Sequence, residues 1–345
     1  MKHIQHICIL LWLTVASNVF ADGMMMTSAP YYIEETGQQA LITYDQASSS
    51  ETLSILPSFR GDTNDFAWII PVPNQPALEE GSEQVFRDLR SLTSPRYHYR
   101  DGDWDGCDRQ NFSPDSADGG GFEIIDSQLV GYYQTMILAA EQAPALLAVL
   151  THWGFLHSEN IDQATDLITD YVERDWYFVT VRVDSTSFAE AFPHGYSQYY
   201  GHLQPLTLTF NNDEIIYPMR ISALSAAEST EVNLFVVGDH RVNFTGATTR
   251  YANRFSQKEY SDLRWHPSLR GYLNPGDFLT HLQRNFAPND MNEDLTIVRA
   301  GNDDEYLQIN YSGVPWLTIF LLGPPALWGS YRWLTRKRKD VRLRS

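Results

Sequence analysis

The sequence predicts an α+β fold, in which a β-rich domain with several short helices lies between a signal peptide and one transmembrane helix. Runs of aromatic and β-branched residues recur along the chain, and the clearest of them is FAWII at residues 66–70. Other segments, such as residues 161–173, space their apolar side chains at helical intervals. Both ends of the 345-residue chain carry uncharged apolar runs. With 43% hydrophobic residues, the chain can also build a sizeable core.

The first 21 residues have the pattern of a signal peptide. Lys2 gives a positive start, an apolar run follows at residues 4–15, and small residues around Ala21 suit cleavage. An uncleaved anchor helix is the alternative, but the run is shorter than the roughly 20 residues that a bilayer requires. We therefore expect the mature protein to lie outside the cytoplasm.

The segments that follow predict a three-stranded β unit joined by short polar turns. Residues 38–44 and 51–57 have loose strand alternation, and residues 66–70 complete the unit. The last strand carries no charge, so we expect it to be buried on both faces. Pro71 and Pro73 then remove two backbone donors, so the chain must leave the sheet or lie along its edge.

A short helix is predicted at residues 83–92. Ser82 stands where its hydroxyl can cap the first turn, and the helix must end before Pro95. The apolar side chains of this segment share one helical face: Val85, Phe86, Leu89 and Leu92.

These segments together resemble a known family. The most specific block is GxxxxFAWIIPVPxxP at residues 61–76, which follows a Gln-x-Ala strand and precedes the helix with Phe86 and Leu89. Later blocks lie at residues 130–133, 146–153, 217–220 and 278–282. The chain is thereby similar, over residues 21–300, to the family catalogued as domain of unknown function 2330, which contains bacterial secreted or membrane-anchored proteins. The resemblance implies architecture and location, and it implies no activity.

One departure from that family concerns cysteine. Members often begin with Cys and Gly-rich sequence after the signal, whereas this chain has Asp22-Gly23-Met24. No cysteine-dependent role is therefore carried over. Cys107 is the one cysteine after the signal, and its acidic neighbours Asp105 and Asp108 favour the unreactive thiol form.

An acidic, Gly-rich loop at residues 100–121 interrupts the periodic pattern. Asp101, Asp103 and Asp105, followed by a glycine, match the early positions of a calcium-binding loop. The twelfth position is Phe112, where such a loop requires a bidentate Glu. Calcium is therefore the one candidate cofactor, and a solvated acidic loop is the interpretation that we favour.

The rest of the domain alternates between strand-like and helix-like segments. Pro144 and Gly154 bracket one helix, and Asn160 precedes another. The predicted helices lie at residues 145–153, 161–173 and 276–286, and the predicted strands at residues 122–125, 128–139, 176–183, 203–210, 214–221, 232–237 and 295–299.

These elements predict one extracytoplasmic domain at residues 22–300. The acidic loop divides it into subregions 22–100 and 122–300. A polar spacer at residues 301–313 follows the domain.

The C-terminal part predicts a membrane anchor. Residues 314–331 contain no charge, and we place the transmembrane helix at 314–334 and a basic cytoplasmic tail at 335–345. Pro324 and Pro325 would kink such a helix. A buried core helix and a sorting tail that is removed after export are the alternatives. The ends together predict a single-pass protein of the bacterial cell membrane, with its domain in the periplasm or outside the cell.

No catalytic motif is present in the sequence. Asp239 and His240 could pair an acid with an imidazole, but no Ser or Cys motif accompanies them. Tyr196, Tyr199 and Tyr200 lie in a Gly-containing segment that could bind a saccharide or a protein, although packing of this segment on its own domain is the preferred interpretation.

The charge of the chain excludes nucleic acid as a partner. The formal charge is −18, and residues 22–313 carry 17 basic and 42 acidic residues, a net charge of −25 that repels nucleic acid and anionic lipid headgroups. The sequence favours a non-enzymatic, membrane-anchored binding or assembly module with a protein or envelope-polymer partner. The alternative is an envelope hydrolase whose catalytic residues are dispersed along the chain.

Overall fold

The computed structural model describes residues 24–28, 31–61, 63, 65–98, 126–139, 143–156, 161–183 and 201–311. These residues fall into two compact units. The larger unit spans the described residues up to 94 and from 126 to 307. In the smaller unit, β6 (Arg96–His98) pairs in parallel with β19 (Ile309–Tyr311).

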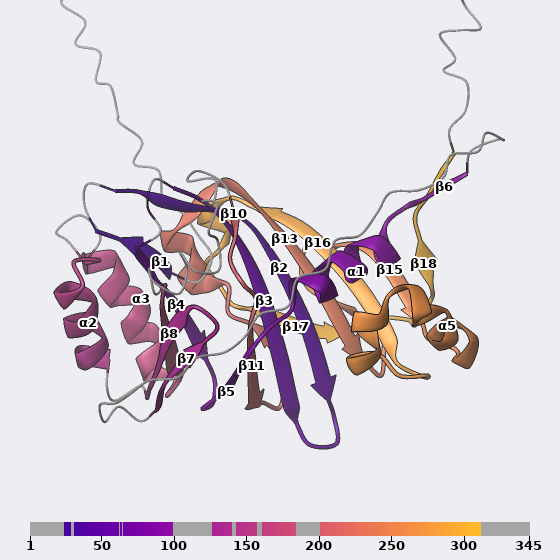
Figure 1. Ribbon diagram of the computed structural model, residues 1–345, viewed down its shortest axis with the longest axis horizontal. Coiled ribbons are helices and arrows are strands. Elements are labelled where there is room, and N and C mark those ends of the chain that lie inside the picture. The colour runs from indigo at the N-terminus through magenta and orange to yellow at the C-terminus, as the bar shows by residue number, and fades with distance from the viewer. Residues whose placement is uncertain are drawn as a thin grey trace, which may run out of the picture. The chain divides into compact units, whose positions relative to one another are not determined.

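A nine-stranded sheet forms the centre of the larger unit (Figure 1). Its order is β18-β15-β16-β13-β2-β3-β11-β5, and β10 lies beside β3. All its pairs are antiparallel except that between β13 and β2. Its strands are β2 (Ile33–Asp45), β3 (Ser50–Gly61), β5 (Ala77–Glu80), β10 (Gly201–His202), β11 (Leu206–Asn211), β13 (Ala226–Gly238), β15 (Thr248–Arg254), β16 (Phe278–Phe286) and β18 (Tyr306–Leu307).

A five-stranded antiparallel sheet packs against it, in the order β1-β4-β9-β8-β7. Its strands are β1 (Met24–Thr27), β4 (Phe66–Val72), β7 (Asp126–Val130), β8 (Tyr133–Leu138) and β9 (Tyr177–Val183). A small third sheet contains β12 (Ile215–Tyr217), β17 (Leu295–Arg299) and β14 (Val242–Asn243).

Helices cover the outer faces of both large sheets. On the five-stranded sheet lie α2 (Ala143–His152) and α3 (Ile161–Glu173), and α1 (Glu83–Thr93) lies on the nine-stranded sheet. Beside α1 are α5 (Gln257–Asp262) and two 3₁₀ helices, η3 (Leu263–Trp265) and η4 (Pro267–Gly271). Two further 3₁₀ helices are η2 (Arg220–Leu224) and η5 (Pro288–Asp290). The unit therefore has four layers in the order helix, sheet, sheet, helix.

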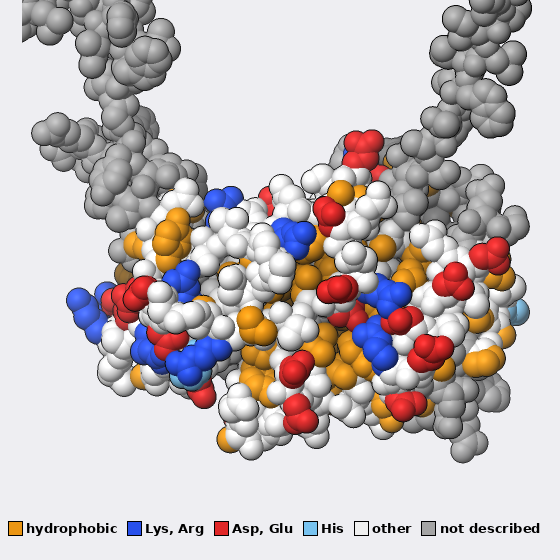
Figure 2. Space-filling view, turned by 180° about the vertical axis from the view of Figure 1, so that it is seen from behind, with side chains coloured by type: hydrophobic (Ala, Val, Ile, Leu, Met, Phe, Trp, Pro, Cys, Tyr) orange, Lys and Arg blue, Asp and Glu red, His pale blue; other side chains and the backbone are white. Residues whose placement is uncertain are grey.

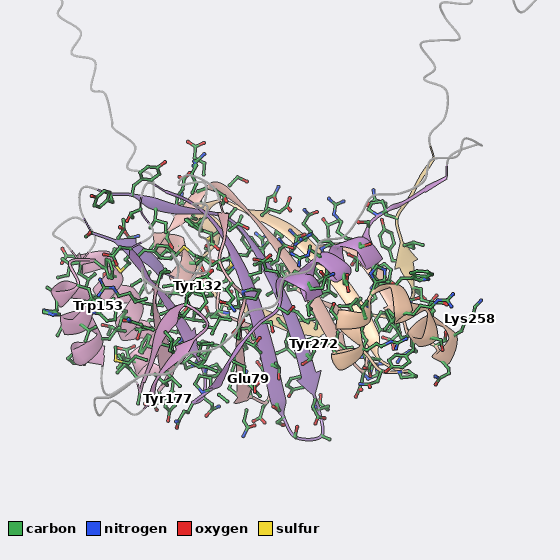
Figure 3. The ribbon with its side chains drawn as sticks, in the orientation of Figure 1. Glu79, Tyr132, Trp153, Tyr177, Lys258 and Tyr272 are labelled. Carbon is green, nitrogen blue, oxygen red and sulfur yellow. The ribbon has the colours of Figure 1, made fainter. Side chains whose placement is uncertain are left out.

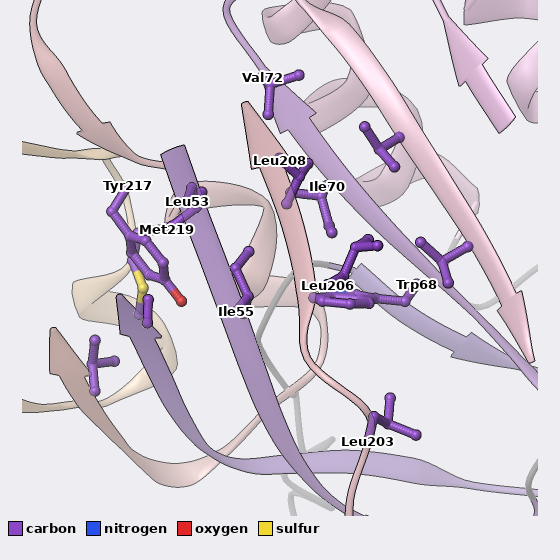
Figure 4. Packing of buried hydrophobic residues seen from close by; sticks show 14 of the residues in the cluster. Leu53, Ile55, Trp68, Ile70, Val72, Leu203, Leu206, Leu208, Tyr217 and Met219 are labelled. Atoms are coloured by element: carbon purple, nitrogen blue, oxygen red, sulfur yellow. The ribbon is translucent and has the colours of Figure 1, made fainter. Parts of the chain in front are cut away.

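β4 shows how the core follows from the sequence. Its side chains are all buried, as the uncharged FAWII run predicts. Trp68 and Ile70 point into the core between the sheets, where they meet Leu206 and Leu208 of β11 (Figure 4). Ala67 and Ile69 point to the opposite face and pack beneath α2 and α3. The strand is thus buried on both faces, because it is covered by a sheet on one side and by helices on the other.

The structure places the first proline inside a strand. Pro71 continues β4 and pairs with Phe178 of β9 on one side. On the other side, β1 pairs with β4 only as far as Ile69 among the described residues.

Several predicted elements are confirmed with small changes in their ends. α1, α2, α3, β9 and β17 lie where the periodicity predicts helices and strands. In α1, Val85, Phe86 and Leu89 are buried, and Leu92 is partly buried. Ser82 occupies the N-cap position, but its hydroxyl makes no capping hydrogen bond, so that detail of the prediction is wrong.

Three predictions are corrected. Residues 276–286 are not a helix: they contain β16, whose backbone pairs with β13 and β15. Residues 128–139 are not one strand, because Gly131, at a φ of +58°, turns the chain between β7 and β8. The three-stranded unit is also wrong, because β2 and β3 pair together while β4 joins the other sheet.

The predicted membrane elements lie outside the described residues. Both the signal peptide at 1–21 and the transmembrane helix at 314–334 belong to this part of the chain. Among the helices that the structure describes, none is long and apolar enough to cross a membrane.

Candidate functional site

The six site residues predicted from the sequence lie outside the described residues: Asp101, Asp103, Asp105, Tyr196, Tyr199 and Tyr200. Cys107 does so as well. Within the described ranges, no group of three His, Cys, Asp or Glu side chains gathers as metal ligands would. The calcium loop and the tyrosine segment therefore stay predictions.

His240 does find a carboxylate partner, but not the one adjacent in sequence. Its Nδ1 lies 3.3 Å from Oδ2 of Asp303, a residue of the predicted polar spacer. The same carboxylate accepts hydrogen bonds from Arg254 Nη2 at 3.0 Å and from the backbone N–H of Arg241 at 3.2 Å. The guanidinium of Arg299 also lies near it, at 3.9 Å. Asp303 therefore joins the loop after β13 to the ends of β15 and β17.

The described residues around His240 do not include the other parts of an acid–base catalyst. A nucleophilic Ser or Cys would have to lie within hydrogen-bond reach of the imidazole. Among the described residues, Asp303 is the one side chain that is hydrogen-bonded to His240. Arg254 contacts the same oxygen of Asp303 as His240 does. The contacts of Asp303 therefore link separate loops of the fold.

A second charged network fixes α3 to the third sheet. Asp294 accepts hydrogen bonds from Tyr171 Oη at 2.7 Å, from Arg174 Nη1 at 2.8 Å and from the backbone N–H of Arg220 at 3.0 Å. The guanidinium of Arg174 also lies over the rings of Tyr171 and Trp176. Burial and the neighbouring Asp294 raise the pKa of Tyr171 well above its usual value, so the hydroxyl stays a donor. The network joins α3 and η2 to the residue that precedes β17.

Two carboxylates lie inside the core between the sheets. Burial raises the pKa of Glu51 in β3 to about 8, although the backbone N–H of Ile216 donates to it at 3.1 Å. Glu35 in β2 is fully buried opposite Phe59, and its two carboxylate oxygens have no hydrogen-bond partner among the described residues. A buried carboxylate lowers the folding stability unless it is neutral or hydrated, so both side chains are expected to destabilise the core.

The segment from α5 to η4 differs from these networks, because several of its long side chains face solvent. We call the exposed side chains of Lys258, Arg264, Trp265 and Arg270 the α5–η4 surface. Trp265 is 66% exposed, the largest value among the exposed large hydrophobic residues that the structure describes. The guanidinium of Arg264 lies 5.2 Å from the centre of its ring. Lys258 extends from α5 at the end of the molecule (Figure 3).

The backbone beneath this surface is fixed. Ser256 and Glu259 form a capping box at the start of α5, with the Glu259 backbone N–H donating to Ser256 Oγ. Leu263 and Leu269 are buried against the outer face of the nine-stranded sheet. Ser268 donates to Asp88 of α1 at 2.7 Å. The exposed side chains are therefore presented by an anchored segment.

The cations of the α5–η4 surface are also unusual in having no ion pair and no hydrogen bond. Among the Lys and Arg side chains that the structure describes, Lys258, Arg264 and Arg270 have neither an ion pair nor a hydrogen bond. The others each have at least one: Arg60, Arg87, Arg90, Arg174, Arg182, Arg220, Arg241, Arg250, Arg254, Arg284 and Arg299. Figure 2, which views the molecule from behind, shows Lys and Arg side chains close together with Asp and Glu at one end. The α5–η4 surface is the candidate functional site of the described chain.

Sequence reasoning missed this surface. No element was predicted between residues 238 and 275, because the segment is short of apolar residues and its helices are brief. A signal was nevertheless present: residues 240–271 contain six Lys or Arg and two acidic residues, in a chain that is otherwise strongly acidic.

Comparison with known proteins identifies a family and no activity. The model of a family described as "Uncharacterized protein conserved in bacteria (DUF2330)" matches residues 15–298. No curated protein matches the chain. Among solved structures, the chain resembles the crystal structure of baculovirus P35 with a TM-score of 0.36 and 10% identity, over 81% of this chain and 97% of that one. A likeness this weak supports no argument about function.

Proposed function

The chain belongs to this uncharacterized bacterial family, and from that premise we propose that it is a non-enzymatic binding or assembly module of the bacterial envelope. It is held in the cell membrane by one helix at residues 314–334, with its domain in the periplasm or outside the cell and its tail in the cytoplasm. The support for this location is the signal-like residues 1–21 and the uncharged run before the basic tail.

The α5–η4 surface is the observation that carries the proposal. It places three unpaired cations beside an exposed tryptophan, on a domain whose other described cations are all engaged. Aromatic and Arg side chains in this combination supply most of the energy at binding interfaces, because they bury large areas and make directional contacts. Because the surface carries unpaired cations, we expect its partner to be anionic.

The charged clusters elsewhere support binding over catalysis. Asp303 and Asp294 each hold backbone and side-chain donors from several elements, which is what a structural carboxylate does. An envelope hydrolase would instead need a nucleophile or an activated water beside His240.

The test is crosslinking and affinity capture of the full-length chain from bacterial membranes. We expect a stable partner, and we expect its recovery to fall several-fold in the double variant Arg264→Gln, Trp265→Ala. The matched control is Arg87→Gln on α1, which removes an exposed cation paired only on its own helix.

The hydrolase alternative predicts a different result. The purified chain would cleave an envelope substrate, and His240→Gln would abolish that cleavage while the double variant at 264 and 265 would retain it. That outcome would overturn the proposed function.

A further inference from the structure

We propose that the α5–η4 surface docks on anionic phospholipid headgroups of the membrane that holds the chain. This inference rests on the proposed function, because it names the partner of the same surface. It treats Lys258, Arg264 and Arg270 as headgroup ligands and Trp265 as the side chain that enters the interface.

The composition of the surface fits a bilayer interface. Tryptophan prefers the headgroup level, where its ring is desolvated while its N–H stays hydrogen-bonded. Lys and Arg are attracted to anionic lipid within a Debye length of the surface. Trp265 is exposed, and the guanidinium of Arg264 lies beside its ring. Because this guanidinium makes no ion pair or hydrogen bond within the described chain, its N–H groups are available to a lipid phosphate.

The path of the chain brings the membrane close to this surface. Leu307 is the last residue of the larger unit, and it packs against the hydrophobic cluster that holds Leu263 and Leu269 of η3 and η4. Only six residues, 308–313, separate Leu307 from the start of the predicted anchor at Val314. A chain of that length reaches at most about 25 Å. A membrane helix beginning at Val314 therefore keeps the cluster beneath the α5–η4 surface near the bilayer.

The charge of the domain supports one orientation. Residues 22–313 carry a net charge of −25, so most of the domain is repelled by an anionic leaflet. The segment from α5 to η4 is a local exception, because residues 257–271 carry three cations against Glu259 and Asp262, a net charge of +1. Turning this surface toward the lipid lowers the repulsion and adds attraction, because the acidic faces then point away from the leaflet.

The experiment uses the full chain in lipid nanodiscs made of phosphatidylcholine alone or with 30% phosphatidylglycerol. Acyl chains brominated near the headgroup quench tryptophans at the interface. Subtracting the signal of Trp265→Phe isolates Trp265 from the other tryptophans of the chain. We expect quenching of Trp265 with phosphatidylglycerol, much weaker quenching with phosphatidylcholine, and loss of quenching in high salt.

Charge variants then test the cations. Each of Arg264→Gln and Arg270→Gln should lower the ratio of docked to undocked molecules about fivefold. Arg87→Gln, which removes an exposed cation on α1, should leave the ratio unchanged. Lack of quenching of Trp265 in the anionic discs would overturn the inference. So would a photoreactive residue at position 265 that crosslinks in cells to an acidic protein and not to lipid.

A separate readout distinguishes failure of the inference from failure of the proposed function. Resistance of the full chain to alkaline extraction from membranes tests the anchor and not the docking. An anchored chain with an unquenched Trp265 would refute the docking alone, whereas an extractable chain would refute the membrane anchor of the proposed function.

Discussion

At the scale of single residues, His281 shows how a polar side chain is fitted beneath α1. Its Nε2 lies 3.0 Å from Asn233 Oδ1, and its Nδ1 lies 3.2 Å from Thr93 Oγ1. The ring stacks on Phe235, with 4.2 Å between the ring centres. Burial, with a contribution from the nearby charge of Arg250, lowers the pKa of His281 from 6.5 to about 4. The folded protein therefore holds this imidazole neutral in mildly acidic solution.

This pKa predicts a loss of stability in acid. Below pH 6.5 the unfolded chain binds a proton at His281 while the folded chain does not, so the unfolding free energy falls until about pH 4. At 1.36 kcal/mol per pKa unit, the loss is about 3 kcal/mol. Urea unfolding between pH 7.5 and 4.5 measures it, and His281→Asn should remove this part of the slope.

A second buried group affects the same measurement with the opposite sign. Glu51, with a pKa raised to about 8, binds its proton more tightly in the folded state, so its contribution is greatest in acid and is lost as the pH rises from 4.5 to 8. The difference between wild type and His281→Asn cancels this contribution. An equal acid slope in both proteins would contradict the assignment to His281.

At the scale of elements, sequence periodicity identifies some segments and misreads others for a physical reason. α3 has the bounds that helical spacing predicts, because its apolar stripe packs on one sheet. In β16, by contrast, Phe278, Leu282 and Phe286 recur every four residues, which satisfies a helical and a strand period alike. The segment forms a strand because its backbone pairs with β13 and β15. β13 lies about 50 residues before β16 in the sequence, so no local pattern could reveal this pairing.

The Asp294 network provides a prediction about elements. Replacement by alanine leaves the Tyr171 hydroxyl, the Arg174 guanidinium and the Arg220 N–H without their shared acceptor. Asp294→Ala should lower the unfolding free energy by about 3 kcal/mol, since the side chain of Asp294 is 8% exposed. Urea unfolding measures this, and Asp290→Ala on the nearby exposed η5 is the control, with an expected change below about 0.5 kcal/mol. Equal stability of the two variants would show that the network contributes nothing.

At the scale of the whole molecule, the sequence predicts the class of fold but not its topology. Subregions 22–100 and 122–300 follow from the acidic loop between them, and in the structure both large sheets contain strands of both segments, which interleave in the nine-stranded sheet. β2 and β3 lie between β13 and β11, and β4 pairs with β9. The candidate surface was likewise beyond prediction, because the unpaired state of Lys258, Arg264 and Arg270 is known only once the partners of the other cations are known.

Interleaved strands predict that the larger unit unfolds as one cooperative body. Ile55 in β3 is 2% exposed and faces the core between the sheets, so Ile55→Ala removes packing that both sheets share. The unfolding free energy should fall by about 3 kcal/mol. Because Ile55 packs in the core that joins the two sheets, the fall should be equal for slowly exchanging amides of β3 and of α3, although α3 lies on the far side of the other sheet. Native-state hydrogen exchange measured by mass spectrometry makes this comparison, with Val298→Ala, at a 53% exposed position, as the control. If β3 loses protection in Ile55→Ala while α3 keeps it, the two segments fold as separate units in spite of their shared sheets.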